Sequence, residues 1–127
     1  MAEEGASLSS GSLKLYYLLP SPSRRGAGGE AVGAIDLYAY DPLNRRCAVG
    51  IMVATEHRRQ GHALAMLQAL AKQYTGILHT LYADIAATNG ASLALFAKAG
   101  YTQCGRFHDW LLVGDRYIDS IRMQLIL

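Results

Sequence analysis

One short basic loop carries residue types that could bind an anion. Residues 58–63 lie between a short apolar run, residues 47–53, and a segment whose apolar residues recur at helical spacing. This pattern predicts a strand over 47–53 and a helix from about residue 60 to residue 74. The first turn of a helix has unpaired backbone N–H groups and positive potential, and a glycine lets a phosphate approach the backbone closely. The loop therefore predicts a polyphosphate site. Its residues are Arg58, Arg59, Gln60, Gly61, His62 and Ala63.

The type of phosphate loop can be narrowed from its spacing. A mononucleotide P-loop ends in Gly-Lys-Ser/Thr, and a dinucleotide-binding turn needs three glycines, whereas this loop has one glycine and no such ending. Arg58, Gly61 and Ala63 instead fit an Arg/Gln-x-x-Gly-x-Gly/Ala pattern. A solvated helix start that binds nothing would carry the same residue types, so that alternative stays open.

A second motif follows the predicted helix. Residues 77–85 predict a strand, and the next residues predict a short helix over about 89–99, with Thr88 or Asn89 as its cap and Gly100 at its end. Two β-rich runs then flank a Gly-Asp turn, which predicts a hairpin. These runs are residues 101–113 and 117–127.

The two motifs together resemble the GNAT family of N-acetyltransferases, which bind acetyl-CoA. The loop is similar to the family's pyrophosphate loop, and residues 88–101 are similar to its Asn-x-x-Ser-x-x-x-Tyr-x-Lys-x-Gly-Phe segment. Residues 105–123 are similar to the polyamine and ribosomal-protein acetyltransferase branch. The resemblance covers about residues 31–127.

The resemblance implies how acetyl-CoA would bind. The pyrophosphate would lie on backbone N–H groups of residues 59–64, with Arg58 and Arg59 adding positive charge. The pantetheine arm would pair with the strand edge at residues 51–53, and Asn89 would hydrogen-bond to it. Lys98 either pairs with the ribose phosphate or is a surface lysine. Outside the loop, the implied cofactor-binding residues are Ile51, Met52, Val53, Asn89, Ser92, Phe96 and Lys98.

The positions that supply catalytic side chains in the family hold unreactive residues here. The resemblance implies that a backbone N–H at Val53 or Ala54 polarises the thioester carbonyl. The family's tyrosine acid position is Phe96 and its glutamate base position is Ala48, so neither side chain transfers a proton. Substitutes lie on the predicted strands, where the same residues are also typical of a polar surface. They are the carboxylates Asp36 and Asp84 and the phenols Tyr38, Tyr82 and Tyr101.

The N-terminal part is shorter than the family pattern. Residues 1–12 are small and polar and are expected to form a disordered tail, so that residues 13–127 form a single domain. Residues 13–19 and 31–40 predict strands, and the glycine-rich residues 21–29 favour a hairpin connection over a phosphate cradle. The resemblance implies two helices over one sheet face, and no amphipathic segment before the loop supplies them. Either that face is partly open or a second subunit covers it, and we expect a homodimer.

Composition bounds the remaining function classes. The chain has 127 residues, of which 51% are hydrophobic and 17% charged, as in a one-domain globular protein. A net charge of +2 is too small to indicate nucleic-acid binding, and no apolar run reaches membrane-spanning length. Cys47 and Cys104 are expected to be reduced thiols in a cytoplasmic protein, and their spacing with the four histidines indicates no metal site. Phe107 and Trp110 are expected in the core.

The predicted fold is α/β, with a GNAT-like mixed, mainly antiparallel sheet that splays between the strands ending near residues 53 and 85. The function that the resemblance implies is acetyl-CoA-dependent N-acetyl transfer to an amine, on a polyamine-like small molecule or a protein N-terminus. Two alternatives stay open: a CoA-binding domain that no longer catalyses and acts as a sensor or subunit, and an interaction domain that has lost CoA as well.

Overall fold

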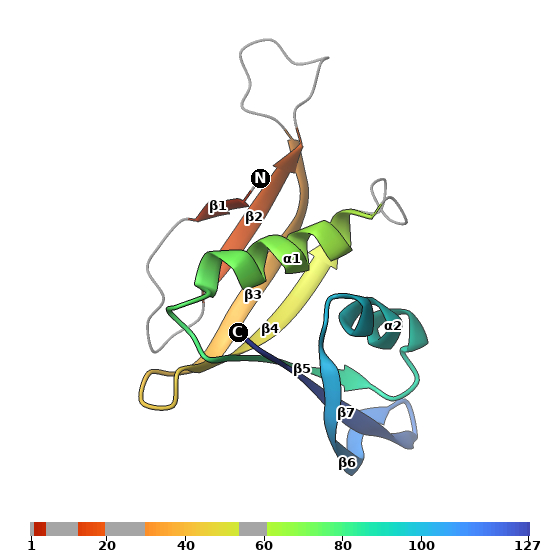
Figure 1. Cartoon of the computed structure of the whole chain (residues 1–127). Helices are drawn as coiled ribbons and strands as arrows, with labels where there is room; N and C mark the ends of the chain where they lie inside the picture. The colour runs from red at the N-terminus through yellow and green to blue at the C-terminus, as the bar shows by residue number, and fades with distance from the viewer. Residues whose placement is uncertain (1, 5–12, 20–29, 54–60) are drawn as a thin grey trace.

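The described part of the chain forms one sheet with two helices (Figure 1). The computed structural model describes residues 2–4, 13–19, 30–53 and 61–127. The strands are β1 Ala2–Glu4, β2 Leu13–Leu19, β3 Glu30–Asp41, β4 Arg46–Val53, β5 Thr80–Ala86, β6 Thr102–Val113 and β7 Arg116–Ile126. The helices are α1 His62–Tyr74 and α2 Gly90–Lys98.

The sheet is mixed and mainly antiparallel, as the sequence predicts. Its seven strands run in the order β1-β2-β3-β4-β5-β7-β6, and the only parallel neighbours among these described strands are β4 and β5. The predicted hairpin is β6 and β7, joined through a positive-φ glycine at Gly114. The strand expected over 77–85 starts three residues later. Gly76, at φ 87°, reverses the chain there, and the amides of Ile77 and Leu78 both donate to the carbonyl of Tyr74.

The parallel pair in the middle of the sheet is short. β4 and β5 share only three paired positions, Arg46 with Thr80, Cys47 with Leu81 and Ala48 with Tyr82. Beyond these positions the two strands part, while β5 stays paired with β7 along its whole length. The predicted splay between the two central strands is therefore confirmed.

One face of the sheet carries the core. Alternate residues of β3, β4 and β5 are buried against the helices, because side chains of a strand point to opposite faces in turn. α1 lies across β3 and β4 (Figure 1) and buries residues spaced along one side of the helix. The buried members of this cluster include Ile35, Leu37, Val49, Met66, Leu67, Leu70, Tyr74, Leu81, Ile85 and Phe96.

The opposite face of the sheet carries the other set of alternate residues. Asp36, Tyr38 and Asp84 are exposed there, and Tyr82 is partly buried. Both described helices contribute to the core on the first face, so no helix within the described ranges covers the second. Among the described residues before the phosphate loop there are strands and no helix.

Two predictions for the N-terminal part fall largely on residues that are not described. Within the expected disordered tail, Ala2–Glu4 pair with β2 as a short strand, which corrects the expectation for these three residues. Edge pairing uses backbone groups alone, so small polar side chains do not prevent it. Residues 5–12 and the predicted hairpin connection at 21–29 lie outside the described ranges.

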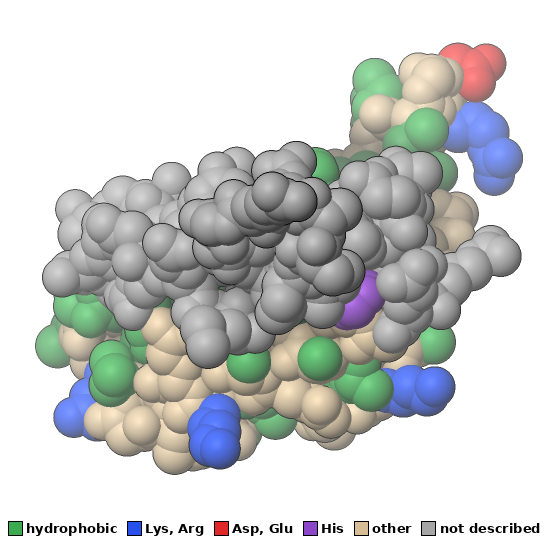
Figure 2. All heavy atoms as spheres, turned by 90° about the horizontal axis from the view of Figure 1, so that it is seen from above, with side chains coloured by type: hydrophobic (Ala, Val, Ile, Leu, Met, Phe, Trp, Pro, Cys, Tyr) green, Lys and Arg blue, Asp and Glu red, His purple; other side chains and the backbone are tan. Residues whose placement is uncertain are grey.

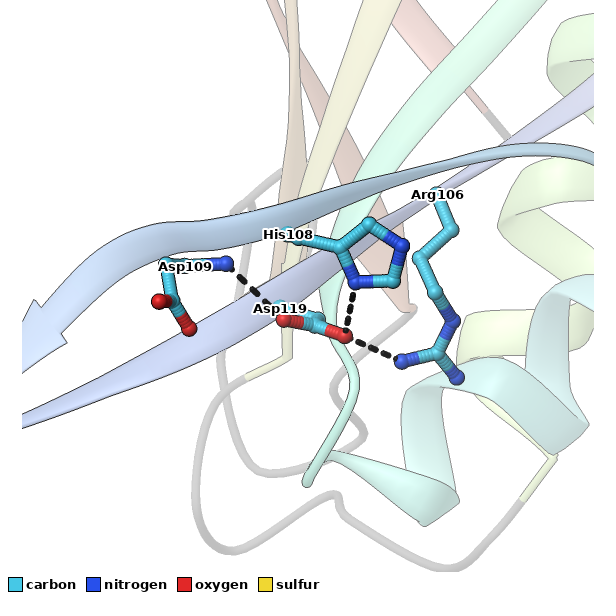
Figure 3. A network of polar contacts seen from close by, with 4 residues as sticks. All are labelled: Arg106, His108, Asp109 and Asp119. Atoms are coloured by element: carbon cyan, nitrogen blue, oxygen red, sulfur yellow. Dashed lines mark hydrogen bonds and ion pairs between the residues drawn. The ribbon is translucent and has the colours of Figure 1, made fainter.

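The Asp119 carboxylate contacts three residues of an irregular stretch of β6 in the β6–β7 hairpin (Figure 3). The pairing register shifts between Phe107 and Leu111, and Asp109 has a positive φ of 49°. Asp119 accepts hydrogen bonds from Arg106 Nη1 at 2.6 Å and from the amide of Asp109 at 2.9 Å, and it contacts His108 Nδ1 at 3.1 Å. The Asp109 amide, the Arg106 guanidinium and His108 hold the pKa of Asp119 below its ordinary value.

Aromatic residues at this bulge correct one prediction. Trp110 is 62% exposed, so it is not a core residue, although its ring packs on that of Phe107 at a centroid distance of 5.0 Å. A bulge changes which face of the hairpin the following side chains point to, and a sequence pattern does not reveal where a bulge occurs.

Two surface properties bear on the function classes. None of the described helices is long and apolar enough to cross a membrane. On the face seen in Figure 2, the Lys and Arg side chains of the described residues stand apart and form no single basic stripe.

Both cysteines are free thiols, and burial raises the pKa of Cys47 to about 11.

Candidate functional site

A cavity opens where β4 and β5 part. It has a volume of about 180 Å³ and is walled by three elements, β4, β5 and the N-terminal part of α2. The cavity exists because no hydrogen bonds join the two strands beyond Ala48 and Tyr82. Its lining residues are Val49, Gly50, Ile51, Ala83, Asp84, Ile85, Ala86, Asn89, Ser92 and Phe96.

A second and larger cavity adjoins the first on the helix side. It measures about 510 Å³ and shares Ile51, Asn89 and Ser92 with the cavity in the splay. Its remaining lining residues are Met52, Ala63, Ala91 and Leu95. Because Ala63 lies in the first turn of α1, the two cavities together have lining residues from the start of that helix to the splay, and we call them the joined cavities.

The start of α1 has the geometry of an anion site. Gly61 is its N-cap, with the left-handed φ of 79° and no side-chain cap hydrogen bond. The carbonyl of Gly61 accepts from the amide of Ala65 at 3.1 Å, which closes the first helical turn. No acidic residue occupies the first turn, so the positive end of the helix dipole is not neutralised from within the helix. Glycine is required here by its backbone conformation as well as by its size.

The start of α2 forms the other wall. The Oδ1 atom of Asn89 accepts from the amide of Ser92 at 3.1 Å, so this side chain caps the helix. The cap uses the oxygen of the amide and leaves its NH₂ group as the donor for a ligand. Phe96 lies one turn further along, 3% exposed, with its ring edge-to-face against Tyr101 at 4.9 Å.

The splay cavity has lining residues from both faces of the sheet, and we call the space between β4 and β5 the passage. Ala83 and Ile85 are buried on the helix face, whereas Asp84 belongs to the alternate set on the opposite face, and all three line the cavity. Gly50 also lies on the opposite side, since a Cβ placed there would be 3.7 Å from Tyr38 and 3.9 Å from Asp36. A molecule bound on the helix side could therefore meet a second molecule that enters from the open face.

Charged and aromatic side chains lie near Asp84 on the open face of the sheet. Asp84 Oδ1 and Oδ2 accept from Arg122 Nε and Nη2 at 2.8 and 2.9 Å, and these hydrogen bonds raise the pKa of Arg122. Burial first, and then the charges of Asp84 and Tyr82, raise the pKa of Tyr38, which keeps this phenol protonated at neutral pH. Ala48, between the paired positions of Tyr38 and Tyr82, is buried, with 1% of its surface exposed.

The structure brings together most of the predicted cofactor residues. Ile51, Met52, Ala63, Asn89, Ser92 and Phe96 line the joined cavities, and Gly61 and His62 begin α1 beside them. Lys98 is exposed at the end of α2 and lines neither cavity. Val53 ends β4, and Arg58, Arg59 and Gln60 lie outside the described residues.

The candidate catalytic residues lie at different places relative to the splay cavity. Asp84 lines the passage, and Asp36 lies on β3 opposite Gly50 in the pairing register, near but not in its wall. Tyr101 is buried beside Phe96 on the helix side, away from Tyr38 and Tyr82. The described residues contain no group of three or more His, Cys, Asp or Glu placed to hold a metal ion.

Sequence reasoning did not identify Gly50 and Arg122 as site residues. Gly50 is a glycine inside an apolar strand, which is a signal for close approach of another group. Arg122 faces Asp84 only through the antiparallel pairing of β5 with β7, which no local pattern reveals.

Comparison with known proteins identifies a matching family and a curated relative. Residues 11–102 match the Acetyltransferase (GNAT) domain family. The chain is 26% identical over 97 residues to a spermidine N(1)-acetyltransferase of Vibrio cholerae serotype O1, and the match covers 75% of this chain and 56% of that enzyme. The chain thus spans little more than half the length of this curated relative.

Solved structures share the architecture. A spermidine N-acetyltransferase from Vibrio cholerae in complex with CoA and spermine superposes with a TM-score of 0.78 at 20% identity, covering 91% of this chain and 65% of that one. A chimera of the Vibrio cholerae enzyme with hSSAT gives a TM-score of 0.77 at 22% identity, covering 91% and 66% of the two chains. At these identities the likeness shows the fold, and the family match covers well over half of the chain. The chain belongs to the GNAT family of acetyltransferase domains.

Proposed function

We propose that this chain is an acetyl-CoA-dependent N-acetyltransferase that acts on an amine, either a polyamine-like small molecule or a protein N-terminus. The observation that carries this proposal is a pair of cavities with shared lining residues, which together extend from the start of α1 to the splay, where Asp84 lines the wall. The spermidine acetyltransferases among its relatives favour the polyamine-like acceptor.

Acetyl-CoA would occupy the helix side of the sheet. Its pyrophosphate would lie at the start of α1, where Arg58 and Arg59 precede the helix. The pantetheine arm would run through the larger cavity along residues 51–53, with the Asn89 amide as a donor. The backbone N–H of Val53 is the proposed donor to the thioester carbonyl, whose carbon would lie within reach of the splay.

The acceptor would enter from the open face. Its neutral nitrogen attacks the thioester carbonyl carbon, a C–N bond forms and the C–S bond breaks. The nitrogen loses one proton to give the amide, and the CoA thiolate takes up one proton. Asp84 and Asp36 are the candidates to receive the proton of the acceptor ammonium, and Tyr38 or Tyr82 to supply one. Orientation of the two reactants contributes up to about 7–11 kcal/mol, so transfer can proceed with modest acid–base assistance.

Turnover with a panel of acceptors tests the proposed function. The full chain is incubated with acetyl-CoA and, in turn, spermidine, a monoamine and a peptide with a free N-terminus, and release of free CoA thiol is followed. We expect release with at least one of these acceptors and none without acceptor. CoA binding without turnover on any acceptor would contradict the enzyme assignment.

The alternative of a CoA-binding domain without catalysis has two observations in its favour. Phe96, at the family's tyrosine acid position, is buried and carries no hydroxyl, and both oxygens of Asp84 are bonded to Arg122. Under this alternative the chain would be a sensor or a subunit of a larger assembly. The same acceptor panel separates it from the enzyme, because it predicts saturable CoA binding with no thiol release.

Phe96→Tyr is expected to raise turnover about tenfold, because a phenol at the cavity wall can protonate the departing thiolate. The Kd of CoA should change less than about threefold, since the ring volume is nearly preserved. Steady-state kcat together with calorimetric CoA affinity checks both statements. A turnover that does not rise would show that the thiolate obtains its proton elsewhere.

We also propose a homodimer. The second sheet face has no helix over it among the described residues, and the end of the β6–β7 hairpin exposes a further apolar surface. That surface consists of Trp110, Leu112, Val113 and Tyr117, each more than half exposed. Exposed apolar area costs roughly 25 cal/mol per Å², and symmetric self-association is the commonest way to bury it. Sedimentation at micromolar concentration is expected to give the dimer mass, and a stable monomer would contradict the proposal.

A further inference from the structure

An arginine that belongs to none of the family motifs meets the carboxylate at the open mouth of the passage. We propose that Arg122 is a positioning residue that holds the Asp84 carboxylate where it receives the ammonium group of a small oligoamine acceptor. The inference rests on the proposed function and specifies its acceptor class. It is independent of which residue protonates the CoA thiolate.

The first observation is the pair of hydrogen bonds from Arg122 to the Asp84 carboxylate. Asp84 and Arg122 are directly opposite partners in the β5–β7 ladder. Two nearly parallel hydrogen bonds, of 2.8 and 2.9 Å, join both oxygens of Asp84 to the Nε and Nη2 atoms of Arg122. This bidentate arrangement fixes the plane of the carboxylate as well as its position, which a lysine could not do.

The second observation is the anchoring of Arg122 itself. Its guanidinium carbon lies 4.5 Å from the ring centroid of Tyr82 and 5.2 Å from that of Phe107. These rings come from β5 and β6, so the guanidinium is held from both neighbouring strands by cation–π contacts. A side chain anchored in this way cannot follow Asp84 if the carboxylate turns into the passage.

The third observation is the place of Asp84. It lines the splay cavity at the level where β4 no longer pairs with β5, so no β4 residue is its hydrogen-bonding neighbour in the ladder. Each carboxylate oxygen accepts more than one hydrogen bond, and the bonds to Arg122 leave acceptor capacity on both oxygens. An ammonium group at the open end of the passage can therefore donate a hydrogen bond to Asp84.

The surroundings suit a cation that carries more than one amine. Asp36 lies across Gly50 from the passage, and Tyr38 and Tyr82 flank the buried Ala48 between them. A chain with one amine at Asp84 and another near Asp36 would cross Gly50 beside the ring of Tyr38. Asp84 and Asp36 place two carboxylates on the open face, on either side of Gly50, which suits a ligand with two cationic groups.

A cross-strand ion pair that only stabilises the hairpin is the competing explanation. The two explanations differ in how the pair affects amine binding. If Arg122 acts through Asp84, then replacing Arg122 has no further effect once Asp84 has lost its charge. If Arg122 is only structural, the two replacements act independently or leave amine binding unchanged.

The test titrates spermidine into the CoA-saturated protein by calorimetry, for the wild type, Asp84→Asn, Arg122→Lys and the double variant. We expect a Kd about thirtyfold weaker for Asp84→Asn and about tenfold weaker for Arg122→Lys, with the double variant no weaker than Asp84→Asn alone. Arg106→Lys is the matched control, because it loosens the Asp119 pair on the same hairpin and should leave the spermidine Kd unchanged.

Each failure has a distinct signature. A wild type that does not bind CoA contradicts the proposed function. CoA binding with no spermidine binding, an unchanged Kd in Arg122→Lys, or additive losses in the double variant each overturn this inference. Arg122→Gln provides a second variant, and thermal unfolding with CoA binding identifies any variant that is misfolded.

Discussion

Ala63→Glu is expected to weaken CoA binding about 100-fold while leaving the fold intact. Ala63 lies in the first turn of α1 and lines the larger cavity, so a carboxylate there would meet the pyrophosphate at close range. The same carboxylate is favourable for the helix itself, because it lies near the positive end of the helix dipole. Affinity and stability should therefore change in opposite directions, which a general loss of folding cannot mimic. Calorimetry with CoA and thermal unfolding measure the two quantities.

Ala65→Glu is the matched control for that experiment. It lies two residues further along α1, is exposed, and lines neither cavity. The helix should gain a similar electrostatic benefit, and the Kd of CoA should stay within about threefold of the wild type. Equal losses in the two variants would show that the anion does not bind in the first turn. Gly61 is a poorer test position, since its φ of 79° would strain any side chain whether or not a phosphate binds.

Gly50→Val is expected to lower kcat/KM for the acceptor at least about 100-fold, because it obstructs the passage through the sheet. A Cβ at Gly50 makes only ordinary contacts, 3.7 Å to Tyr38 and 3.9 Å to Asp36, and valine suits a strand. The branched methyl groups, however, extend between the open face and the splay. Steady-state kinetics with the best acceptor measures the loss, and the Kd of CoA should change little because CoA lies on the helix side.

Gly105→Val on β6 controls for the effect of adding a branched side chain to a strand. A Cβ at Gly105 meets nothing within 4 Å, and this residue lines neither cavity. Its kcat/KM should remain near that of the wild type. A comparable loss in Gly105→Val, or full activity in Gly50→Val, would show that acceptor and thioester do not meet through the splay.

The local elements followed from the sequence because the patterns that specify them are local. Apolar residues at helical spacing predicted a helix over about 60–74, and α1 spans His62–Tyr74 with Met66, Leu67 and Leu70 buried. Thr88 or Asn89 was predicted as a helix cap, and Asn89 is the cap, since its short side chain reaches the amide three residues on. The phosphate loop and the second motif were predicted on the same grounds. The cavities bring Ala63, Asn89 and Ser92 together on one side of the splay.

Tertiary structure alone decided how the two faces of the sheet are used. The pairing of Asp84 with Arg122 depends on the register of two strands, and the two residues lie 38 positions apart in the chain. No periodicity near either residue encodes that register. The exposure of Trp110 depends in the same way on a bulge stabilised by Asp119 from the neighbouring strand.

The sequence by itself therefore determined the helices, the strands and the residue types at the starts of α1 and α2. The packed sheet determined the passage between β4 and β5 and the pairing of Asp84 with Arg122. Helical spacing, capping and turn conformation are set by residues within a few positions of one another, so they can be predicted from the residue order. The gap between β4 and β5 arises where their parallel pairing stops after Ala48, while β7 stays paired to the other edge of β5 along its whole length. Where the two strands stop pairing depends on residues far apart in the chain, so no local pattern encodes it.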